Sequence, residues 1–386
     1  MDLLIKNARI ITPDKILTDH LLCISRGKIK DILLKKPYYS QLKRTVKTID
    51  AGGLYVSPGL VDIHIQGFKG EDVWSGPESV FRLSRSLLSS GTTSFVPTTH
   101  FHEQTIRDII QARARLEEDT PVSEILGIHL EGPFINPLKK GMIPLSSIQR
   151  YNPRLLDNIL KLTQDQLILM TIAPEMPNSA ELIKQLKKKR IVIAAGHTKA
   201  DFEQANQSFK QGVSQITHLF NAMEPIHHRK PGGIMAALLN PGISVQIIVD
   251  GHHIHPAVLQ LVLELKSSDN VILITDAVKA AGLKDGYYKM SGQTICLKKG
   301  KVVSKRGILS GSALSLLGAV KNMLKFTHVS LAEAIKMATL TPARSIGFDR
   351  RKGSLTKGKD ADLIFLNDKL QIRGIIKNGK IITLSL

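Results

Sequence analysis

Acidic and histidine side chains stand at the ends of short apolar runs along the middle of the chain. Ile128 and Leu130 lead into Glu131, and Gly132 and Pro133 then end any strand. A buried carboxylate is costly unless it is paired or binds a metal ion. The same pattern recurs at Asp62, His64, Glu131, His197, His218, His253 and Asp276. This recurrence predicts that these side chains form one site.

Two histidines and one carboxylate with an open coordination position suit a catalytic Zn²⁺, and also Fe²⁺. We interpret Glu131, His197 and His218 as the metal ligands. A metal of this kind lowers the pKa of bound water to about 7 and polarises a carbonyl group. Asp276 can then act as the carboxylate that takes a proton and passes it to a leaving amine. The combination is typical of C–N bond hydrolysis in amides, cyclic amides or amidines.

Each of these residues also has a structural interpretation. A single histidine at a strand end is commonly a hydrogen-bonded core residue, and Glu131 could cap a helix or pair with a lysine. Asp276 could be a helix N-cap, a frequent role of aspartate. The recurrence on consecutive strands favours the functional interpretation, because the set is stronger evidence than any member.

The elements that must position these residues alternate along the chain from about residue 56 to residue 345. Amphipathic, helix-like stretches such as 179–190 and 201–212 separate apolar runs, which indicates a parallel α/β fold. About 290 residues with this rhythm fit a (β/α)8 TIM-type barrel, whose active site lies at the carboxyl ends of the strands. The apolar runs are 93–98, 124–132, 167–175, 191–198, 215–223, 244–253 and 271–277.

The two ends of the chain have a different texture from the middle. Residues 1–55 and 346–386 alternate apolar and polar positions, with glycine-containing turns such as Asn378-Gly379. We therefore predict one small β-sandwich domain formed from both termini, and a barrel domain over 56–345.

Composition bounds the class of protein. The 386 residues carry a net charge of +20, but the lysine and arginine clusters are scattered and aromatic residues make up only 5%. A lysine-rich surface accounts for this charge better than a nucleic-acid site, which needs a continuous basic face. Two cysteines, no apparent signal peptide and no apolar run of about 20 residues predict a cytoplasmic protein that does not bind membranes.

Several motifs resemble those of the amidohydrolase superfamily and, within it, the N-acetylglucosamine-6-phosphate deacetylase family. The resemblance covers essentially the whole chain. General superfamily features are PGLVDIH (58–64), TDA (275–277) and GSLTKGKDADLIFL (353–366). The more specific motifs are HLEGPF (129–134), AGHT (195–198), HLFNAM (218–223), RKPGG (229–233), DGHH (250–253) and LSGSAL (309–314).

The resemblance implies a role for each matching residue. Glu131, His197 and His218 would bind the main divalent metal, and Asp276 would act first as general base and then as acid. His253 would polarise the acetamide carbonyl. The remaining implied substrate contacts are Asn221, Ala222, Leu309, Ser310, Gly311 and Arg229, whose partner is the 6-phosphate. In the family this arginine reaches across from the neighbouring subunit, so the resemblance also implies a homodimer.

Two positions depart from the family pattern. Many superfamily members have His-X-His after the first barrel strand, where this chain has His64-Ile65-Gln66. Glutamine is a poor ligand for a catalytic transition metal, so we expect one metal, with His64 a weak second-site ligand or a structural residue. The second departure is Ile143, which stands where the family usually has a histidine that helps to bind the sugar phosphate. His227 and His228 could compensate.

We therefore predict metal-dependent deacetylation of N-acetyl-D-glucosamine 6-phosphate to D-glucosamine 6-phosphate and acetate, in aminosugar catabolism or cell-wall recycling. One alternative is a related amidohydrolase that acts on another N-acyl sugar, an N-acyl amino acid or a cyclic amide, which Ile143 leaves open. A second is a non-enzymatic binding protein on a retained barrel, against which the complete metal and acid–base set argues.

Overall fold

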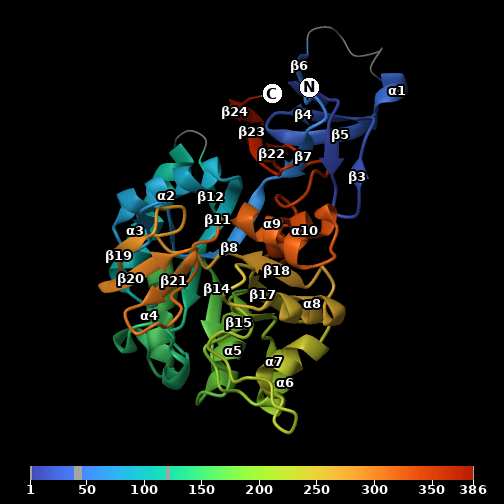
Figure 1. The fold of residues 1–386 in the computed structure, drawn as a ribbon. Coiled ribbons are helices and arrows are strands. Elements are labelled where there is room, and N and C mark those ends of the chain that lie inside the picture. Colours follow the sequence, from blue (N-terminus) through green and yellow to red (C-terminus); the bar gives the residue numbers. More distant parts are fainter. Residues whose placement is uncertain (1, 39–45, 119–121, 386) are drawn as a thin grey trace.

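A barrel of parallel strands occupies the middle of the computed structural model, which describes residues 2–38, 46–118 and 122–385 (Figure 1). The neighbouring strands of the barrel pair in parallel and, with one exception, in chain order. The exception is a short strand between the second and third. The barrel strands are Leu60–Ile65 (β8), Thr92–Thr99 (β11), Ile128–Glu131 (β13), Leu167–Ile172 (β14), Val192–Ala195 (β15), Gln215–Ile216 (β16), Ser244–Ile248 (β17) and Val271–Ile274 (β18).

The last barrel strand, β18, lies beside the first, β8. The backbone N–H of Asp276 donates to the carbonyl oxygen of His64 at 2.8 Å, and the N–H of Gln66 donates to that of Ala277 at 2.9 Å. These bonds lie just beyond the carboxyl ends of β18 and β8. They hold Asp276 beside the end of the first strand, which matters for the site below.

Helices separate the strands and surround them (Figure 1). The predicted stretch 201–212 forms a helix because Asp201 and Gln204 make a reciprocal capping box, and Gly212 ends it with a positive φ of 138°. The barrel helices are Pro77–Ser89 (α2), Glu103–Glu118 (α3), Pro153–Thr163 (α4), Ser179–Lys188 (α5), Phe202–Gln211 (α6), Gly232–Leu239 (α7), Pro256–Leu265 (α8), Leu316–Phe326 (α9), Leu331–Met337 (α10) and Leu340–Ser345 (α11).

The barrel strands are covered on both faces, as parallel strands between helices must be. Every residue of β8, β11, β13 and β18 is buried. Such burial favours apolar residues, as in β18, so the buried charged or ionisable residues Asp62, His64 and Glu131 of β8 and β13 stand out. β11 differs, because five of its eight residues are threonine or serine.

The run 124–132, which the pattern predicts as one strand, is divided. Glu124–Ile125 forms a short strand, β12, which pairs with β11 and is the exception noted above. Gly127 separates it from β13. A Cβ atom at Gly127 would lie 2.9 Å from the carbonyl oxygen of Gln166, so the close approach of these two backbones requires glycine.

The two ends of the chain meet in a β-sandwich beside the barrel, where the N and C labels of Figure 1 lie together. One sheet has the order β5-β4-β1-β6, and the other, β24-β23-β22-β7-β2-β3, joins both termini. The strands are Leu3–Lys6 (β1), Arg9–Ile11 (β2), Ile16–Leu17 (β3), His20–Ser25 (β4), Lys28–Leu34 (β5), Lys47–Asp50 (β6), Tyr55–Pro58 (β7), Leu363–Leu366 (β22), Ile372–Lys377 (β23) and Lys380–Leu384 (β24); helix α1 is Lys35–Tyr38.

The predicted fold class, a TIM-type barrel with a small β-sandwich from both termini, is confirmed. The domain limits at residues 55 and 345 stay a prediction, and residues 39–45 of the N-terminal part lie outside the described residues. Among the helices that the structure describes, none has both the length and the apolar content needed to cross a bilayer.

A three-stranded antiparallel sheet that the sequence analysis does not predict follows β18. Its first turn, at residues 291–292, reaches the cavity described below. The sheet consists of Gly286–Met290 (β19), Gln293–Lys298 (β20) and Lys301–Ser304 (β21). The remaining short elements are Gly67–Phe68 (β9), Glu71–Asp72 (β10), and the 3-10 turns Pro137–Lys139 (η2) and Leu145–Ser147 (η3).

A buried charge cluster joins the β-sandwich to the barrel. The Nζ atom of Lys352 lies 2.8 Å from Asp360 and 2.8 Å from Asp362, and Glu124 of β12 completes the set. Lys377 lies 2.7 Å from Asp362. Burial would raise the pKa of Asp362, but the two lysines hold it below its usual value. The ammonium groups take the positions that a metal cation would occupy among the three carboxylates.

Replacing Asp362 with alanine is expected to destabilise the fold by about 3 kcal/mol, because breaking a buried pair leaves a buried charge uncompensated. The Lys377 side chain is only 3% exposed, and Glu124 lies 3.7 Å away, so the loss of Asp362 leaves its charge without a close carboxylate. Lys352 keeps its pairs with Asp360 and Glu124. Urea unfolding measures the change. The matched control is Asp368→Ala: Asp368 is 80% exposed and pairs with Arg9, and its loss should cost about 0–1 kcal/mol. Equal losses in the two variants would contradict this account of the junction.

Candidate active site

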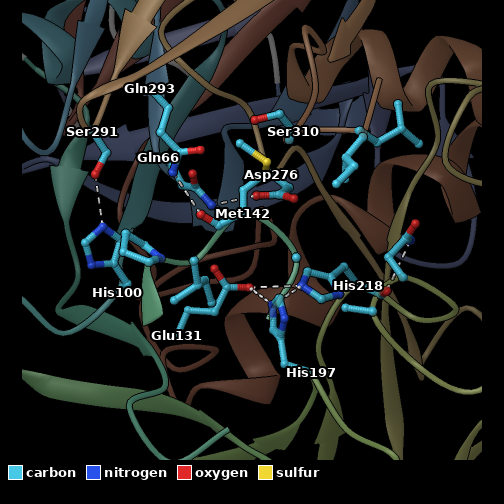
Figure 2. Close-up of a pocket in the computed structure, with 18 of the residues that line it drawn as sticks. Gln66, His100, Glu131, Met142, His197, His218, Asp276, Ser291, Gln293 and Ser310 are labelled. Atoms are coloured by element: carbon cyan, nitrogen blue, oxygen red, sulfur yellow. Dashed lines mark hydrogen bonds and ion pairs between the residues drawn. The ribbon is translucent and has the colours of Figure 1, made fainter. Parts of the chain in front are cut away.

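A cavity of about 350 Å³ opens at the carboxyl ends of the barrel strands and gathers most of the predicted site residues (Figure 2). Its lining combines side chains that follow six different strands with the turn of the three-stranded sheet. The predicted residues that line it are Glu131, His197, His218, Asn221, Ala222, His253, Asp276, Leu309, Ser310 and Gly311. These predicted site residues therefore lie together in one cavity.

Three side chains converge on one point in the cavity floor. The Oε1 atom of Glu131 lies 3.0 Å from Nε2 of His197 and 2.9 Å from Nε2 of His218. The two Nε2 atoms are 3.1 Å apart. Figure 2 shows the carboxylate and both rings directed toward one another. All three residues are buried, and together they form a group that could hold a metal ion.

The protonation pattern of this group fits a metal ion. Nδ1 of His197 lies 2.7 Å from the carbonyl oxygen of Lys139 and donates to it, so Nε2 is the ring nitrogen that would bind a metal ion. Glu131 also offers a lone pair at the same point. Two ligands of one tetrahedral zinc ion stand roughly 3.3 Å apart at ordinary bond lengths, close to the separations here.

The electrostatics of the floor keep the carboxylate ionised. Burial would raise the pKa of Glu131, but His64, His197 and His218 hold it well below its usual range. Burial likewise opposes a charge on His64, yet the carboxylates of Asp276 and Glu131 raise its pKa to about 9. Glu131 is therefore an anion at neutral pH, as a metal ligand must be.

The backbone at three of these strand ends adopts a left-handed conformation that non-glycine residues rarely occupy. The φ angles are 49° at His197, 28° at His218 and 45° at Asp276. Such conformations cost on the order of 1–3 kcal/mol each and cluster at functional sites. Here they turn the chain out of the strand directly at the residue whose side chain enters the cavity.

Asp276 lies next to Glu131, His197 and His218, which we call the floor group, and its neighbours hold its side chain in place. Nε2 of Gln66 donates to Oδ1 of Asp276 at 3.0 Å, and Nε2 of His64 lies 3.3 Å from the same oxygen. Gly311, with φ 60°, packs against it: a Cβ atom there would lie 2.7 Å from the carbonyl oxygen of Asp276. In the sequence Gln66 stands out only as a poor metal ligand, and no sequence signal indicates its hydrogen bond to Asp276.

His253 is oriented by Asp250, a residue that the sequence analysis quotes in the DGHH motif without a role. Nδ1 of His253 lies 2.7 Å from Oδ2 of Asp250, and the backbone N–H groups of His252 and His253 donate to Oδ1. Burial would raise the pKa of Asp250, but these hydrogen bonds and the nearby imidazole hold it below its usual value. The ionised Asp250 therefore fixes Nδ1 of His253 as a donor.

Three further residues on one side of the cavity were not predicted. His100 stacks on Trp74 with ring centroids 5.5 Å apart, and its two ring nitrogens lie within hydrogen-bonding distance of Ser147 and Ser291. Burial lowers the pKa of His100. His100 follows β11 directly, so the rule that identified the other residues also applies to it. Trp74 and Ser291 carry no comparable sequence signal.

Four more residues that the sequence singles out lie in different places relative to the cavity. His64 is fully buried next to the floor, and Asp62 lies deeper, where it accepts a 2.6 Å hydrogen bond from the Thr275 hydroxyl. Burial raises the pKa of Asp62 to about 6. Ile143 lines the cavity. Arg229 is exposed outside the cavity lining of this single subunit, with Nη1 2.8 Å from Nε2 of His228.

Comparisons with known proteins agree with this geometry. The model of the amidohydrolase family matches residues 55–382. The chain is 34% identical to an N-acetylglucosamine-6-phosphate deacetylase of Bacillus subtilis over 99% of this chain and 98% of the relative. It is 33% identical to an N-acetylgalactosamine-6-phosphate deacetylase of Escherichia coli O157:H7, over 97% of each. A solved N-acetylglucosamine-6-phosphate deacetylase from Pasteurella multocida superposes with a TM-score of 0.91, at 28% identity over 99% of each chain.

Proposed function

The chain belongs to the amidohydrolase family, and we propose that it removes the acetyl group from N-acetyl-D-glucosamine 6-phosphate. The products are D-glucosamine 6-phosphate and acetate, so the protein is a hydrolase of a linear amide C–N bond. The observation that carries the proposal is the convergence of Glu131, His197 and His218 within 3.1 Å, in the cavity that Asp276 also lines.

Glu131, His197 and His218 would hold one divalent metal ion, Zn²⁺ or Fe²⁺ by the chemistry of the donor set. When bound, such an ion acidifies water and polarises the acetamide carbonyl. Gln66, at the position where a second histidine ligand would stand, donates to Asp276, which supports a single ion. His64 then serves to support Asp276.

Asp276 accounts for the proton transfers. Its carboxylate takes a proton from the attacking water as the C–O bond forms, and it returns that proton to the nitrogen as the C–N bond breaks. The amine then leaves neutral and the acetyl carbon leaves as acetic acid, which loses its remaining proton to solvent and becomes acetate at neutral pH. One group can perform both transfers because it lies beside the floor group, 3.3 Å from His64.

His253 stabilises the negative charge that develops on the carbonyl oxygen. Asp250 accepts the Nδ1 proton, so Nε2 is the ring nitrogen that can donate to the substrate. In the ring form with a hydrogen on both nitrogens, Nδ1 donates to Asp250 and Nε2 to the carbonyl oxygen. Preorganised donors of this type contribute about 10²–10³-fold in rate. Asn221, Ala222 and the segment 309–311 are proposed to hold the sugar, partly through backbone groups.

Arg229 is proposed to bind the 6-phosphate of a substrate in the neighbouring subunit of a homodimer. Its guanidinium is exposed and outside the cavity lining of its own subunit, which agrees with a role in trans. An arginine can hold a phosphate by two parallel hydrogen bonds. A charged sugar phosphate does not cross a bilayer, so we place the reaction in the cytoplasm, in aminosugar catabolism or cell-wall recycling.

Mixed dimers test the role of Arg229. Separately, Arg229→Ala and Asp276→Asn proteins should both be weak. After mixing and subunit exchange, a hybrid dimer contains one site with an intact Asp276 and a partner's intact Arg229, so activity should recover to about a quarter of the wild-type value if exchange is random. Mixing Asp276→Asn with Arg229→Ala/Asp276→Asn protein is the control. Absence of recovery despite exchange, followed by mass spectrometry, would assign Arg229 to its own subunit or to no role.

The substrate class is tested by comparing three sugars with the metal-loaded protein. We expect kcat/KM for N-acetylglucosamine 6-phosphate to exceed that for unphosphorylated N-acetylglucosamine by at least about 100-fold, because a bidentate charged contact is lost. N-acetylgalactosamine 6-phosphate is the third sugar, because the Escherichia coli relative is named for it. Equal use of phosphorylated and unphosphorylated sugar would overturn the phosphate assignment.

A further inference from the structure

We propose that Gln66 is a positioning residue that holds the carboxylate of Asp276 in the orientation needed for proton transfer. This inference rests on the proposed function for its chemical meaning, but its geometry does not. Gln66 and Asp276 both line the cavity, and Nε2 of Gln66 lies 3.0 Å from Oδ1 of Asp276 (Figure 2). The amide nitrogen must face the carboxylate, because the amide oxygen would be repelled by it.

The backbone fixes both partners of this hydrogen bond. Gln66 follows β8 and Asp276 follows β18, the two strands whose ends close the barrel. The N–H of Gln66 donates to the carbonyl oxygen of Ala277 at 2.9 Å, and the N–H of Asp276 donates to that of His64 at 2.8 Å. The two side chains therefore have rigid origins, and their hydrogen bond restricts the remaining rotation of the aspartate.

His64 provides a second contact with the same oxygen. Its Nε2 lies 3.3 Å from Oδ1 of Asp276, and its Nδ1 lies 3.2 Å from Oε1 of Gln246. The amide of Gln246 is itself oriented, since its Nε2 donates to Oε1 of Gln215 at 3.1 Å. A chain of fixed polar groups thus leads from the barrel interior to Asp276. Both contacts engage Oδ1, which assigns Oδ2 as the oxygen that exchanges the proton.

The hydrogen bond from Gln66 can persist through the reaction. When Oδ2 takes the proton, Oδ1 becomes a carbonyl oxygen, and it still accepts from the amide N–H. The carboxyl group then keeps its orientation between accepting the proton from water and delivering it to the amine. A donor that persists in both states is what a shuttle group needs, because misplacement by about 1 Å costs rate.

Two substitutions at position 66 test the proposal. Gln66→Leu removes the donor at nearly the same size, and kcat should fall about 10- to 100-fold, since a hydrogen bond to a charged group is lost. KM and the metal content should stay within about twofold of wild type, because neither the ligands nor the substrate contacts change. Gln185→Leu, on the outer surface of α5, is the control and should leave all three quantities unchanged.

Gln66→Glu separates positioning from simple packing. It keeps the length of glutamine but offers a donor only when it is protonated. Its kcat relative to wild type should therefore rise as the pH is lowered, whereas the ratio for Gln66→Leu should not rise. Wild-type kcat in Gln66→Leu, or a loss that appears only in KM or in metal content, would overturn the proposal.

A structural measurement keeps this test independent of the proposed substrate. In a crystal structure of the metal-loaded wild-type protein, the Asp276 side chain should have one orientation. In the metal-loaded Gln66→Leu protein it should be rotated or occupy two conformations. An unchanged Asp276 in the variant would refute the positioning role even if the protein acts on another substrate. Failure of the wild type to release acetate, with Asp276 displaced in the variant, would refute the proposed function alone.

Discussion

Replacing Glu131 with glutamine should remove the bound metal and the hydrolytic activity together. The side chain keeps its shape but loses the negative charge that stabilises a cation between two neutral imidazoles. We expect metal content to fall from one ion per subunit to a small fraction, and acetate release to fall at least about 10³-fold, as expected when several kcal/mol of electrostatic stabilisation is lost. Elemental analysis and acetate release, measured on the same sample, give both quantities.

Two results bear on this prediction. Glu181→Gln changes an exposed glutamate on α5 in the same way and should retain both metal and activity. A Glu131→Gln protein that keeps a full complement of metal and most of its activity would contradict the assignment of the floor group. Because Glu131 is only 5% exposed, thermal unfolding should be recorded alongside, so that a loss of fold is recognised as such.

Replacing Asp276 with asparagine should separate chemistry from metal binding. Asparagine cannot take a proton from water or return it to the amine, so we expect kcat to fall about 10²–10⁴-fold. Its amide oxygen can still accept from Gln66, so the local structure should survive. Metal content should remain at the wild-type value, since Asp276 is not a member of the floor group.

The control for this variant is Asp201→Asn, at the N-cap of α6, where asparagine caps as well as aspartate. It should show wild-type kcat and metal content. If Asp276→Asn retains kcat within about tenfold, or if it loses metal in parallel with activity, Asp276 is not the proton-transfer group. The contrast with Glu131→Gln is therefore the informative one: activity is lost in both variants, but metal in only one.

Much of the site could be predicted because the chemistry of a barrel concentrates at one place. The carboxyl ends of parallel strands share one face, so Glu131, His197, His218, His253 and Asp276 could be brought together from strand order alone. Each also ends an apolar run, because strands buried on both faces favour apolar residues. A polar residue at such a place is therefore easy to recognise in the sequence. His100 also follows a barrel strand directly, so the same rule could have identified it.

The hydrogen bonds among these residues could not be predicted in the same way. The bond from Gln66 to Asp276 depends on the register between β8 and β18, which are about 200 residues apart in the chain and meet only when the barrel closes. The three-stranded sheet at 286–304 brings Ser291 into the cavity. Ile295 and Leu297 alternate as buried residues in β20, but a strand of six residues does not indicate which part of the barrel it packs against.

Direct detection of products from N-acetylglucosamine 6-phosphate is the measurement that tests the central claim. Protein loaded with Zn²⁺ or Fe²⁺ is incubated with the sugar, and NMR quantifies acetate and glucosamine 6-phosphate, with Asp276→Asn protein as the blank. We predict that both products appear in equal amounts, catalytically, and only with the wild type. Folded, metal-loaded wild-type protein that releases neither product would contradict the proposed function.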